Sequence, residues 1–317
     1  MKKLLLAVAV SSVAAGSANA ATVYEKDGFT YKLNGDFQVQ MRQNIGDETE
    51  SLGVDFDDMK LENEVSYDLG GGLSGFGSLT VDFKDDAEDG KDASGDEIEV
   101  EESYVGMEYS VFAVSFGRRD FATDEFGIEE AYEEPIGEDQ FEATDETGDD
   151  AIRVDVEFDN IYVAASHEMD ANDTDGVEGE YYDLFVGTEF AGLELGAAYK
   201  QAKIQGPDSE DTWGVSAAYD LGIAGLAADY SVTDEANGNP ETTLYNVAAT
   251  FDVASTTGVA LGMQNQEEDG NEDVTGWYAN VTYKFPEAKN VRLFAEVADT
   301  DEDNMDLGYL AGLRVKF

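Results

Sequence analysis

The chain ends in the stretch Asp306-Leu-Gly-Tyr-Leu-Ala-Gly-Leu-Arg-Val-Lys-Phe317. Side chains of a β-strand point alternately to its two faces, so every second residue here shares a face. One face of this strand is apolar and holds Leu307, Tyr309, Ala311, Leu313, Val315 and Phe317. The opposite face ends in two cations, Arg314 and Lys316. One face suited to lipid and one suited to water are typical of an outer-membrane β-barrel strand.

The first twenty residues have the parts of a secretory signal peptide. Lys2 and Lys3 precede an apolar run from Leu4 to Ala15, and Ala18-Asn19-Ala20 forms a small-x-small cleavage site. The apolar run is shorter than the roughly 20 residues that a membrane-spanning helix needs. We therefore expect cleavage after residue 20 and a single barrel domain over residues 21–317, since only helices and closed sheets cross a bilayer.

Charge and cysteine content narrow the class of protein. The 317 residues include 71 acidic and 18 basic residues, giving a formal net charge of −53, which excludes nucleic acid as a partner. Cysteine is absent, so no disulfide stabilises the fold. The many acidic side chains of this chain repel one another. Dissolved salt weakens this repulsion beyond about 8 Å at physiological ionic strength, so we hypothesise a marine or halophilic source.

Segments with alternating apolar and polar residues recur along the chain. We count sixteen, an even number that suits a closed antiparallel bacterial barrel. They span residues 30–43, 59–69, 75–84, 97–109, 111–118, 151–158, 161–168, 181–190, 193–201, 212–220, 223–232, 243–252, 258–265, 275–285, 291–298 and 306–317. Trp277, Tyr283 and Phe285 share one face near segment ends, as in the aromatic girdles of membrane barrels. A soluble sandwich or solenoid is the alternative.

The connections alternate between short turns and longer acidic loops, the pattern of periplasmic turns and external loops. The longest runs from Asp120 to Asp150 and contains no basic residue. Such a loop can set ion selectivity if it folds into a barrel, or it can be a solvated acidic loop outside.

At this point the chain resembles the general diffusion porins of Gram-negative bacteria. The resemblance rests on both termini, on Leu73-Ser-Gly-Phe-Gly-Ser-Leu-Thr-Val-Asp-Phe83, and on Val114-Ser-Phe-Gly-Arg118 before the long loop. It implies a trimeric, all-β, 16-stranded antiparallel transmembrane barrel in the outer membrane, with the third external loop, about 120–150, folded into the lumen. Pro135-Ile-Gly-Glu-Asp139 is similar to the family's Pro-Glu-Phe-Gly-Gly turn but lacks the Phe.

The resemblance also implies which residues form the pore. The acidic residues expected on the constriction loop are Asp120, Asp124, Glu125, Glu129, Glu130, Glu133, Glu134, Glu138 and Asp139. The basic residues expected on the pore wall are Lys60, Arg153, Arg42, Arg119 and Arg314, and the acidic ones are Asp36, Glu62 and Glu101. Lys60 and Arg153 align with the family's basic ladder, and Glu101 stands where the family usually has Arg. Tyr309 and Phe317 are expected to form the assembly signal read by the barrel-assembly machinery.

These expectations predict a passive, cation-preferring diffusion channel for ions and small hydrophilic solutes. Its expected partners are outer-membrane lipid, lipopolysaccharide and two further copies of itself, with no cofactor and no metal site. A solute-specific channel, for example for sugars, is the alternative and would use inward aromatics such as Phe185, Tyr162, Tyr278 and Phe294. An outer-membrane hydrolase or an acidic secreted β-protein is less favoured. The single histidine, His167, and Ser166 are adjacent in a strand and point to opposite faces, so we expect no enzyme.

Overall fold

The computed structural model describes residues 21–46, 51–84, 99–128, 130–137, 139–141, 146–172, 178–203, 209–234, 240–268 and 270–317. The expected signal peptide and the loop acids Glu129 and Glu138 lie outside these residues. Within these residues we find no helix that is both long and apolar enough to cross a membrane.

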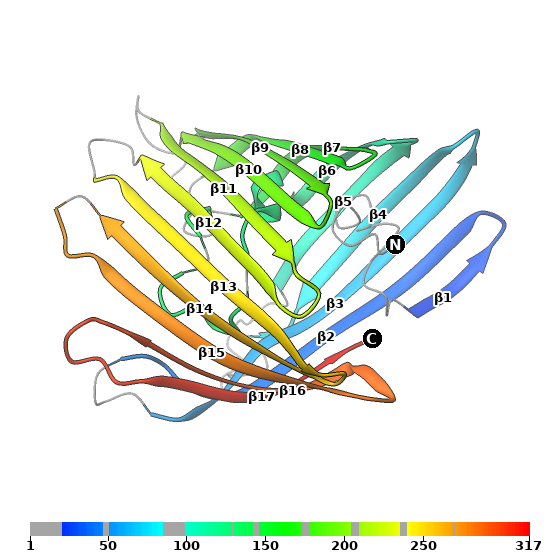
Figure 1. Ribbon diagram of the computed structural model, residues 1–317. Coiled ribbons are helices and arrows are strands. Elements are labelled where there is room, and N and C mark those ends of the chain that lie inside the picture. Colours follow the sequence, from blue (N-terminus) through cyan, green and yellow to red (C-terminus); the bar gives the residue numbers. More distant parts are fainter. Residues whose placement is uncertain are drawn as a thin grey trace, which may run out of the picture.

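Strands make up most of the described chain (Figure 1). They are β1 (Ala21–Lys26), β2 (Phe29–Gln43), β3 (Gly53–Gly70), β4 (Leu73–Asp82), β5 (Glu99–Tyr109), β6 (Phe112–Asp120), β7 (Thr147–Phe158), β8 (Ile161–Asn172), β9 (Glu178–Phe190), β10 (Leu193–Lys203), β11 (Glu210–Asp220), β12 (Gly225–Asp234), β13 (Thr242–Ala254), β14 (Thr257–Glu268), β15 (Val274–Phe285), β16 (Ala288–Thr300) and β17 (Gly308–Lys316). A short 3-10 helix, η1 (Ala122–Glu125), follows β6.

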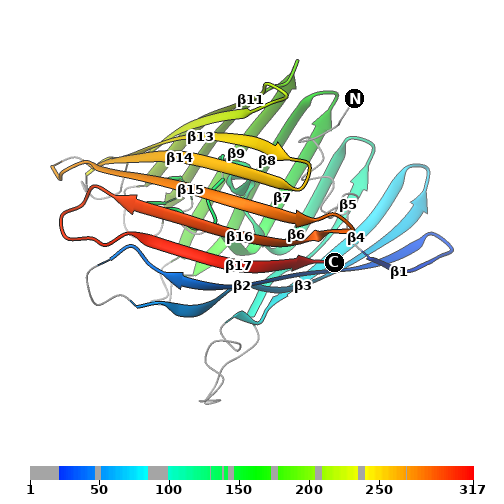
Figure 2. The same ribbon diagram turned by 60° about the horizontal axis from the view of Figure 1, so that its bottom comes forward.

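The sheet closes into a barrel. From β2 to β17, each strand pairs antiparallel with the next strand along the chain. β17 then pairs with β2, from Tyr309 opposite Gln43 to Lys316 opposite Asp36, and Figure 2 shows these two strands side by side. Closure gives every wall strand two hydrogen-bonded neighbours, as a membrane requires. The predicted antiparallel 16-stranded barrel is confirmed.

The additional strand β1 was not predicted from the sequence. It pairs with the first part of β2, from Lys26 opposite Phe29 to Ala21 opposite Leu33, whereas β17 pairs with residues 36–43. β1 and β17 therefore share one edge of β2, and the closed wall consists of the sixteen strands β2 to β17. The turn between β1 and β2 is Asp27-Gly28, with φ of 53° and 82°. Asp-Gly with positive φ at both residues is a strong hairpin signal, and it could have revealed β1.

Burial follows the predicted alternation. On β17, Tyr309 is 41% exposed and Leu313 43%, whereas Leu310 between them is 5% exposed. The same division holds around the wall, where apolar side chains are exposed on one face and polar side chains such as Gln38, Ser231 and Gln264 are buried on the other. The apolar face thus points outward and the polar face inward, as a barrel in lipid requires.

Several strands are longer than predicted. β3 begins at Gly53 rather than at residue 59, and β7 begins at Thr147 rather than at residue 151. Backbone pairing continues where the alternating pattern stops, because a strand beyond the lipid no longer needs an apolar outer face. The long connection therefore spans residues 121–146, and Asp149 and Asp150 belong to β7.

Phe317 completes the seam between the two ends of the chain. Its amide donates to the Gly35 carbonyl at 2.9 Å, and the Gly35 amide donates to the Phe317 carbonyl at 2.9 Å. The Phe317 ring lies against Gly35 and packs edge-on to Phe37, with 5.7 Å between ring centroids. A Cβ at Gly35 would stand 2.2 Å from Phe317 Cζ, so only glycine leaves room for the ring here. The assembly role expected for Tyr309 and Phe317 stays a prediction.

We predict that Gly35→Ala destabilises the barrel by about 1–3 kcal/mol, because the new methyl group must displace the Phe317 ring. Unfolding in urea from lipid vesicles, followed by tryptophan fluorescence, measures this change. Gly53→Ala is the matched control, because no atom lies within 4 Å of a Cβ at that position. Equal stability of the two variants would show that the Phe317 ring does not depend on Gly35.

Candidate functional site

The 121–146 segment is the longest connection between successive strands, and its contacts define the candidate site. Hydrogen bonds link it to inward-facing side chains on β7, β8 and β9 near its start, on β12 and β14 further along, and on β2, β15 and β16 around residues 130–134. These strands lie in distant sectors of the wall. The segment is therefore held by the wall at three places. The first attachment is at β7–β9 and the third at β2, β15 and β16. In the second, at β12 and β14, the Gln140 amide donates to Ser231 Oγ at 2.9 Å and Gln264 donates to the Gly137 carbonyl at 2.6 Å.

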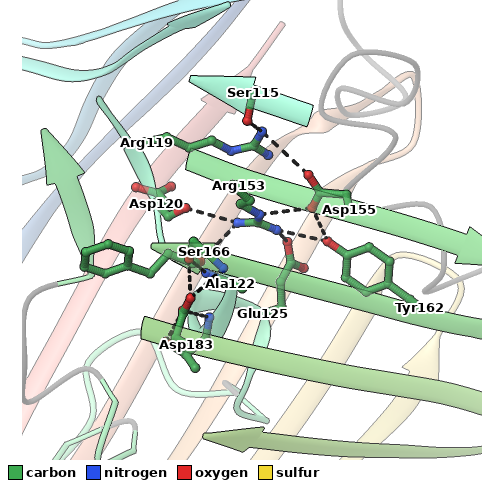
Figure 3. A network of polar contacts seen from close by, with 12 residues as sticks. Ser115, Arg119, Asp120, Ala122, Glu125, Arg153, Asp155, Tyr162, Ser166 and Asp183 are labelled. Carbon is green, nitrogen blue, oxygen red and sulfur yellow. Dashed lines mark hydrogen bonds and ion pairs between the residues drawn. The ribbon is translucent and has the colours of Figure 1, made fainter. Parts of the chain in front are cut away.

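The first attachment fixes the start of η1 (Figure 3). The Thr123 amide and hydroxyl both donate to Asp183 Oδ2, at 2.7 and 2.9 Å, and the Ala122 amide donates to Ser166 Oγ at 2.8 Å. Asp183 also accepts the Ser166 amide at 2.9 Å. The first amides of a helix have no partner within it, so side chains of β8 and β9 supply the acceptors.

Arg153 lies beneath this attachment and is 2% exposed. Its guanidinium donates to Glu125 Oε1 at 2.6 Å, to Asp155 Oδ1 at 3.0 Å and to the Tyr162 hydroxyl at 3.0 Å (Figure 3). It also donates to the carbonyls of Asp120 and Phe121, at 3.2 and 3.0 Å. Alternation placed Arg153 inward, and its guanidinium donates both to the segment, at Glu125 and Phe121, and to its wall neighbours Asp120, Asp155 and Tyr162. It anchors the loop instead of facing open space.

Arg119 is buried in the same network. It donates to Ser115 Oγ and lies 3.8 Å from Asp155 Oδ2 (Figure 3). It also stacks over the Tyr104 ring at 4.5 Å from the centroid. Two of the five basic residues expected on the pore wall therefore form a buried base for the segment. Charge-assisted hydrogen bonds of this kind fix geometry because removal of one partner leaves a buried charge alone.

Apolar contacts fill the space between the segment and β7–β11. Phe126 packs on Phe141 with ring centroids 4.9 Å apart, within a buried cluster that includes Tyr162 and Phe185. Wall glycines make room for these rings, since a Cβ at Gly214 would stand 2.6 Å from Phe126 Cζ. This sector is packed shut. Tyr162 and Phe185 are therefore unavailable to a solute, although they were candidates for a sugar track.

The third attachment holds residues 130–134 against β15 and β16. The amides of Tyr132 and Glu133 donate to the two carboxylate oxygens of Glu296, at 2.8 and 3.0 Å. Tyr132 stacks on Phe294 with 3.9 Å between centroids and an interplanar angle of 10°. Asn280 of β15 donates to the Glu130 carbonyl at 2.7 Å. Sequence reasoning missed Glu296 and Asn280. The sequence feature that could have revealed them is a polar residue at an inward position of a strand.

Glu133 and Glu134 are held on the two sides of this attachment. Glu133 Oε1 lies 2.7 Å from Arg42 Nη1 and accepts from Gln40 Nε2 at 2.7 Å, whereas Glu134 accepts from Gln264. Burial raises the pKa of Glu133 to about 7, although Arg42 opposes the shift. This carboxyl therefore changes charge close to neutral pH.

The remaining predicted wall charges pair with one another. Lys60 Nζ lies 2.8 Å from Glu101 and 3.7 Å from Asp58. Arg314 lies 2.6 Å from both Asp36 and Asp58. Glu62 accepts from Asn34 at 2.7 Å. Glu101 thus compensates the charge of Lys60, and Asp36 and Asp58 compensate that of Arg314.

A cavity of about 1200 Å³ lies along the inner wall. Its charged lining residues are the carboxylates Asp57, Asp58, Glu130, Glu146, Glu194, Asp220 and Asp252 and the cations Lys60, Lys84, Lys284, Arg292 and Arg314. Of the described acids predicted on the loop, only Glu130 lines this cavity. Glu133 and Glu134 line a smaller cavity of about 210 Å³ beside β2, β16 and β17.

The other described acids predicted on the loop line neither of these two cavities. Asp120 accepts from the Thr147 hydroxyl at 2.8 Å, Glu125 pairs with Arg153, and Asp139 is buried and accepts the Phe141 amide at 2.6 Å. Asp124 is exposed at the first turn of η1.

No nucleophile, base and acid come together at the single histidine. His167 stacks on Tyr182 with 4.3 Å between ring centroids, whereas the neighbouring Ser166 is buried on the opposite face and binds Asp183. A hydrolase triad needs the serine and histidine to share a hydrogen bond. This pair has no such geometry.

Comparisons with known proteins point to one family. Residues 6–305 match the family model described as Gram-negative porin. Porin-like protein H of Photobacterium profundum is 26% identical, over 100% of both chains. A monosaccharide porin of a Halomonas species is 26% identical, over 100% of this chain and 76% of the relative. The trimer form of OmpT from Vibrio cholerae is similar in structure with a TM-score of 0.76 and 19% identity, over 92% of this chain and 100% of that one. At that identity the structural likeness shows the fold alone.

We predict that Arg153→Ala destabilises the protein by about 3–5 kcal/mol, because Asp155 and Glu125 lose a buried partner. Unfolding in urea measures the loss. Arg118→Ala is the control, because its ion pair with Asp149 is solvent-exposed and contributes about 1 kcal/mol or less. A stable Arg153→Ala variant would mean that the segment does not depend on this anchor.

Proposed function

We propose that this chain, which belongs to the Gram-negative porin family, is a passive diffusion channel that prefers cations. The family and the fold place it in the outer membrane and point to a channel rather than an enzyme. A barrel with an apolar outer face and a polar inner face offers water-soluble molecules a path across the lipid.

The observation that carries this proposal is the set of contacts between the 121–146 segment and the inner wall. The segment packs against β7–β11 on one side and is held by Glu296 and Asn280 on the other. These contacts support a segment that lies across the barrel interior and narrows it. On this proposal, the passage follows the cavity of about 1200 Å³ that lies between Tyr132 and the wall strands β2, β3 and β10–β17.

The charges along this path favour cations. Seven carboxylates and five cations line the cavity, and two of those cations, Lys60 and Arg314, already have carboxylate partners. A charged lining raises the local concentration of ions of opposite sign. The excess of carboxylates over cations along this cavity is smaller than the net charge of −53 suggests. We therefore expect a moderate cation preference that salt weakens.

Solute range is the second part of the proposal. A relative is named a monosaccharide porin, which keeps a sugar-specific channel as the alternative. Tyr162, Phe185, Tyr278 and Phe294 are all buried, so they offer no continuous aromatic track to a sugar. We therefore favour a channel without strong solute specificity. Because a similar structure is a trimer form, we also propose a homotrimer.

Reversal potentials across a planar bilayer with a tenfold KCl gradient test the charge preference. We expect a reversal potential whose sign shows that K⁺ is more permeant than Cl⁻. We expect Glu130→Gln to lower the ratio of K⁺ to Cl⁻ permeability by up to about fourfold, because that is the Coulomb effect of one carboxylate near 5 Å in water. Glu287→Gln is the control, because Glu287 is exposed and does not line the cavity. A wild-type channel that selects Cl⁻, or one that saturates with a single sugar, would contradict the proposal.

The pKa of Glu133 gives a separate prediction. Because this pKa is raised to about 7 from 4.5, Glu133 is mostly charged at pH 8 and mostly neutral at pH 6. Neutral Glu133 removes one negative charge and leaves Arg42 with Asp55 as its carboxylate partner, so the cation preference should fall as the pH drops through 7. Reversal potentials at both pH values measure this step. The step should vanish in Glu133→Gln, and an unchanged step in that variant would assign it to another group.

A further inference from the structure

Two cations stand side by side on the inner wall below the third attachment. Lys284 of β15 lies opposite Arg292 of β16 in the strand register. Both line the cavity of about 1200 Å³, and their neighbours Tyr283 and Leu293 point outward and are exposed. The pair therefore faces the proposed passage. It lies one inward position nearer the periplasmic ends of these strands than Thr282 and Phe294.

Neither cation has a carboxylate partner within 4.0 Å among the residues that the structure describes, whereas Lys60, Arg42 and Arg314 each have two. Arg292 Nε is buried and makes no hydrogen bond within the same part of the chain. In a chain with 71 acidic residues, two adjacent cations without an acidic partner are a specific arrangement. A buried charged donor is costly unless an acceptor reaches it.

The surroundings of the pair limit what can bind. Arg314 of β17 is the next residue in register beside Arg292, and its guanidinium is already held by Asp36 and Asp58. Those two carboxylates offset its charge, so among the described residues the positive charge without an ion-pair partner here belongs to Lys284 and Arg292. On the external side, the stacked rings of Tyr132 and Phe294 close the space, and the Tyr132 hydroxyl is bonded to Thr282 at 2.6 Å. The open approach is along the cavity.

We propose that Lys284 and Arg292 bind the oxyanion group of a permeating solute, a phosphate or a carboxylate. A guanidinium presents a planar fork of donors that matches the oxygens of such a group, and an ammonium adds a compact charge. The site gives an otherwise acidic passage one position where the negative end of a solute is held. This inference rests on the proposed channel function.

Inorganic phosphate is the probe. Single-channel currents are recorded in planar bilayers at constant K⁺ concentration, ionic strength and pH, while phosphate replaces chloride on the periplasmic side. We expect a saturable decrease in wild-type conductance. The double variant Lys284→Gln/Arg292→Gln should need at least tenfold more phosphate for half of the effect. Arg292→Lys, which keeps the charge and loses the fork, should lie between the two and serves if the double variant does not fold.

Lys289→Gln is the matched control, because Lys289 lies at the start of β16, is exposed and does not line the cavity. It removes one positive charge close by and should leave phosphate sensitivity unchanged. A wild-type channel that ignores phosphate, or an equal loss in Lys289→Gln, would overturn the site. A chain that folds but conducts no ions would overturn the proposed function instead, so the two failures differ.

Discussion

The pairing of β17 with β2 is the constraint on which the structure depends. Inside hydrocarbon, each backbone amide and carbonyl must find its partner within the protein, because no water is available. A sheet of this size meets that requirement only by closing on itself. Closure in turn fixes which side chains point inward, and it brings Glu296 of β16, Gln40 of β2 and Asp183 of β9 within reach of one segment.

Several inner charges hold the structure in place. Arg153 bonds to Glu125 and fixes the start of the 121–146 segment, Arg119 lies beside Asp155 in the same network, and Arg42 holds Glu133 further along. Each of these pairs removes a cation from the passage and also a carboxylate. A chain with a large acidic excess therefore presents a lining in which the two signs are much closer to balance. The net charge of the chain therefore overstates the imbalance of charge along this lining.

Alternation predicted which face each wall residue occupies, but not which residue it contacts. The outward Tyr309 and the inward Arg314 follow directly from the pattern at the end of the chain. The partner of Arg153 does not follow from it, because Glu125 lies on a loop whose path depends on the whole barrel. The Glu296 attachment is harder still, since it joins residues 163 positions apart. Periodicity is a local signal, whereas these contacts depend on curvature and on loop packing. The short β1 was missed for a different reason, since six residues give too little alternation to stand out.

The shared edge of β2 has a consequence for biogenesis. Because β1 and β17 occupy successive stretches of one edge, the first and last strands of the described sheet meet on the same neighbour. The ring is thus sealed only when the final residues arrive, and a chain cut short before β17 would leave two long unpaired margins. Such margins recruit other chains. A truncated chain released into the periplasm would therefore aggregate rather than insert, so only a chain that includes the last strand would form the barrel.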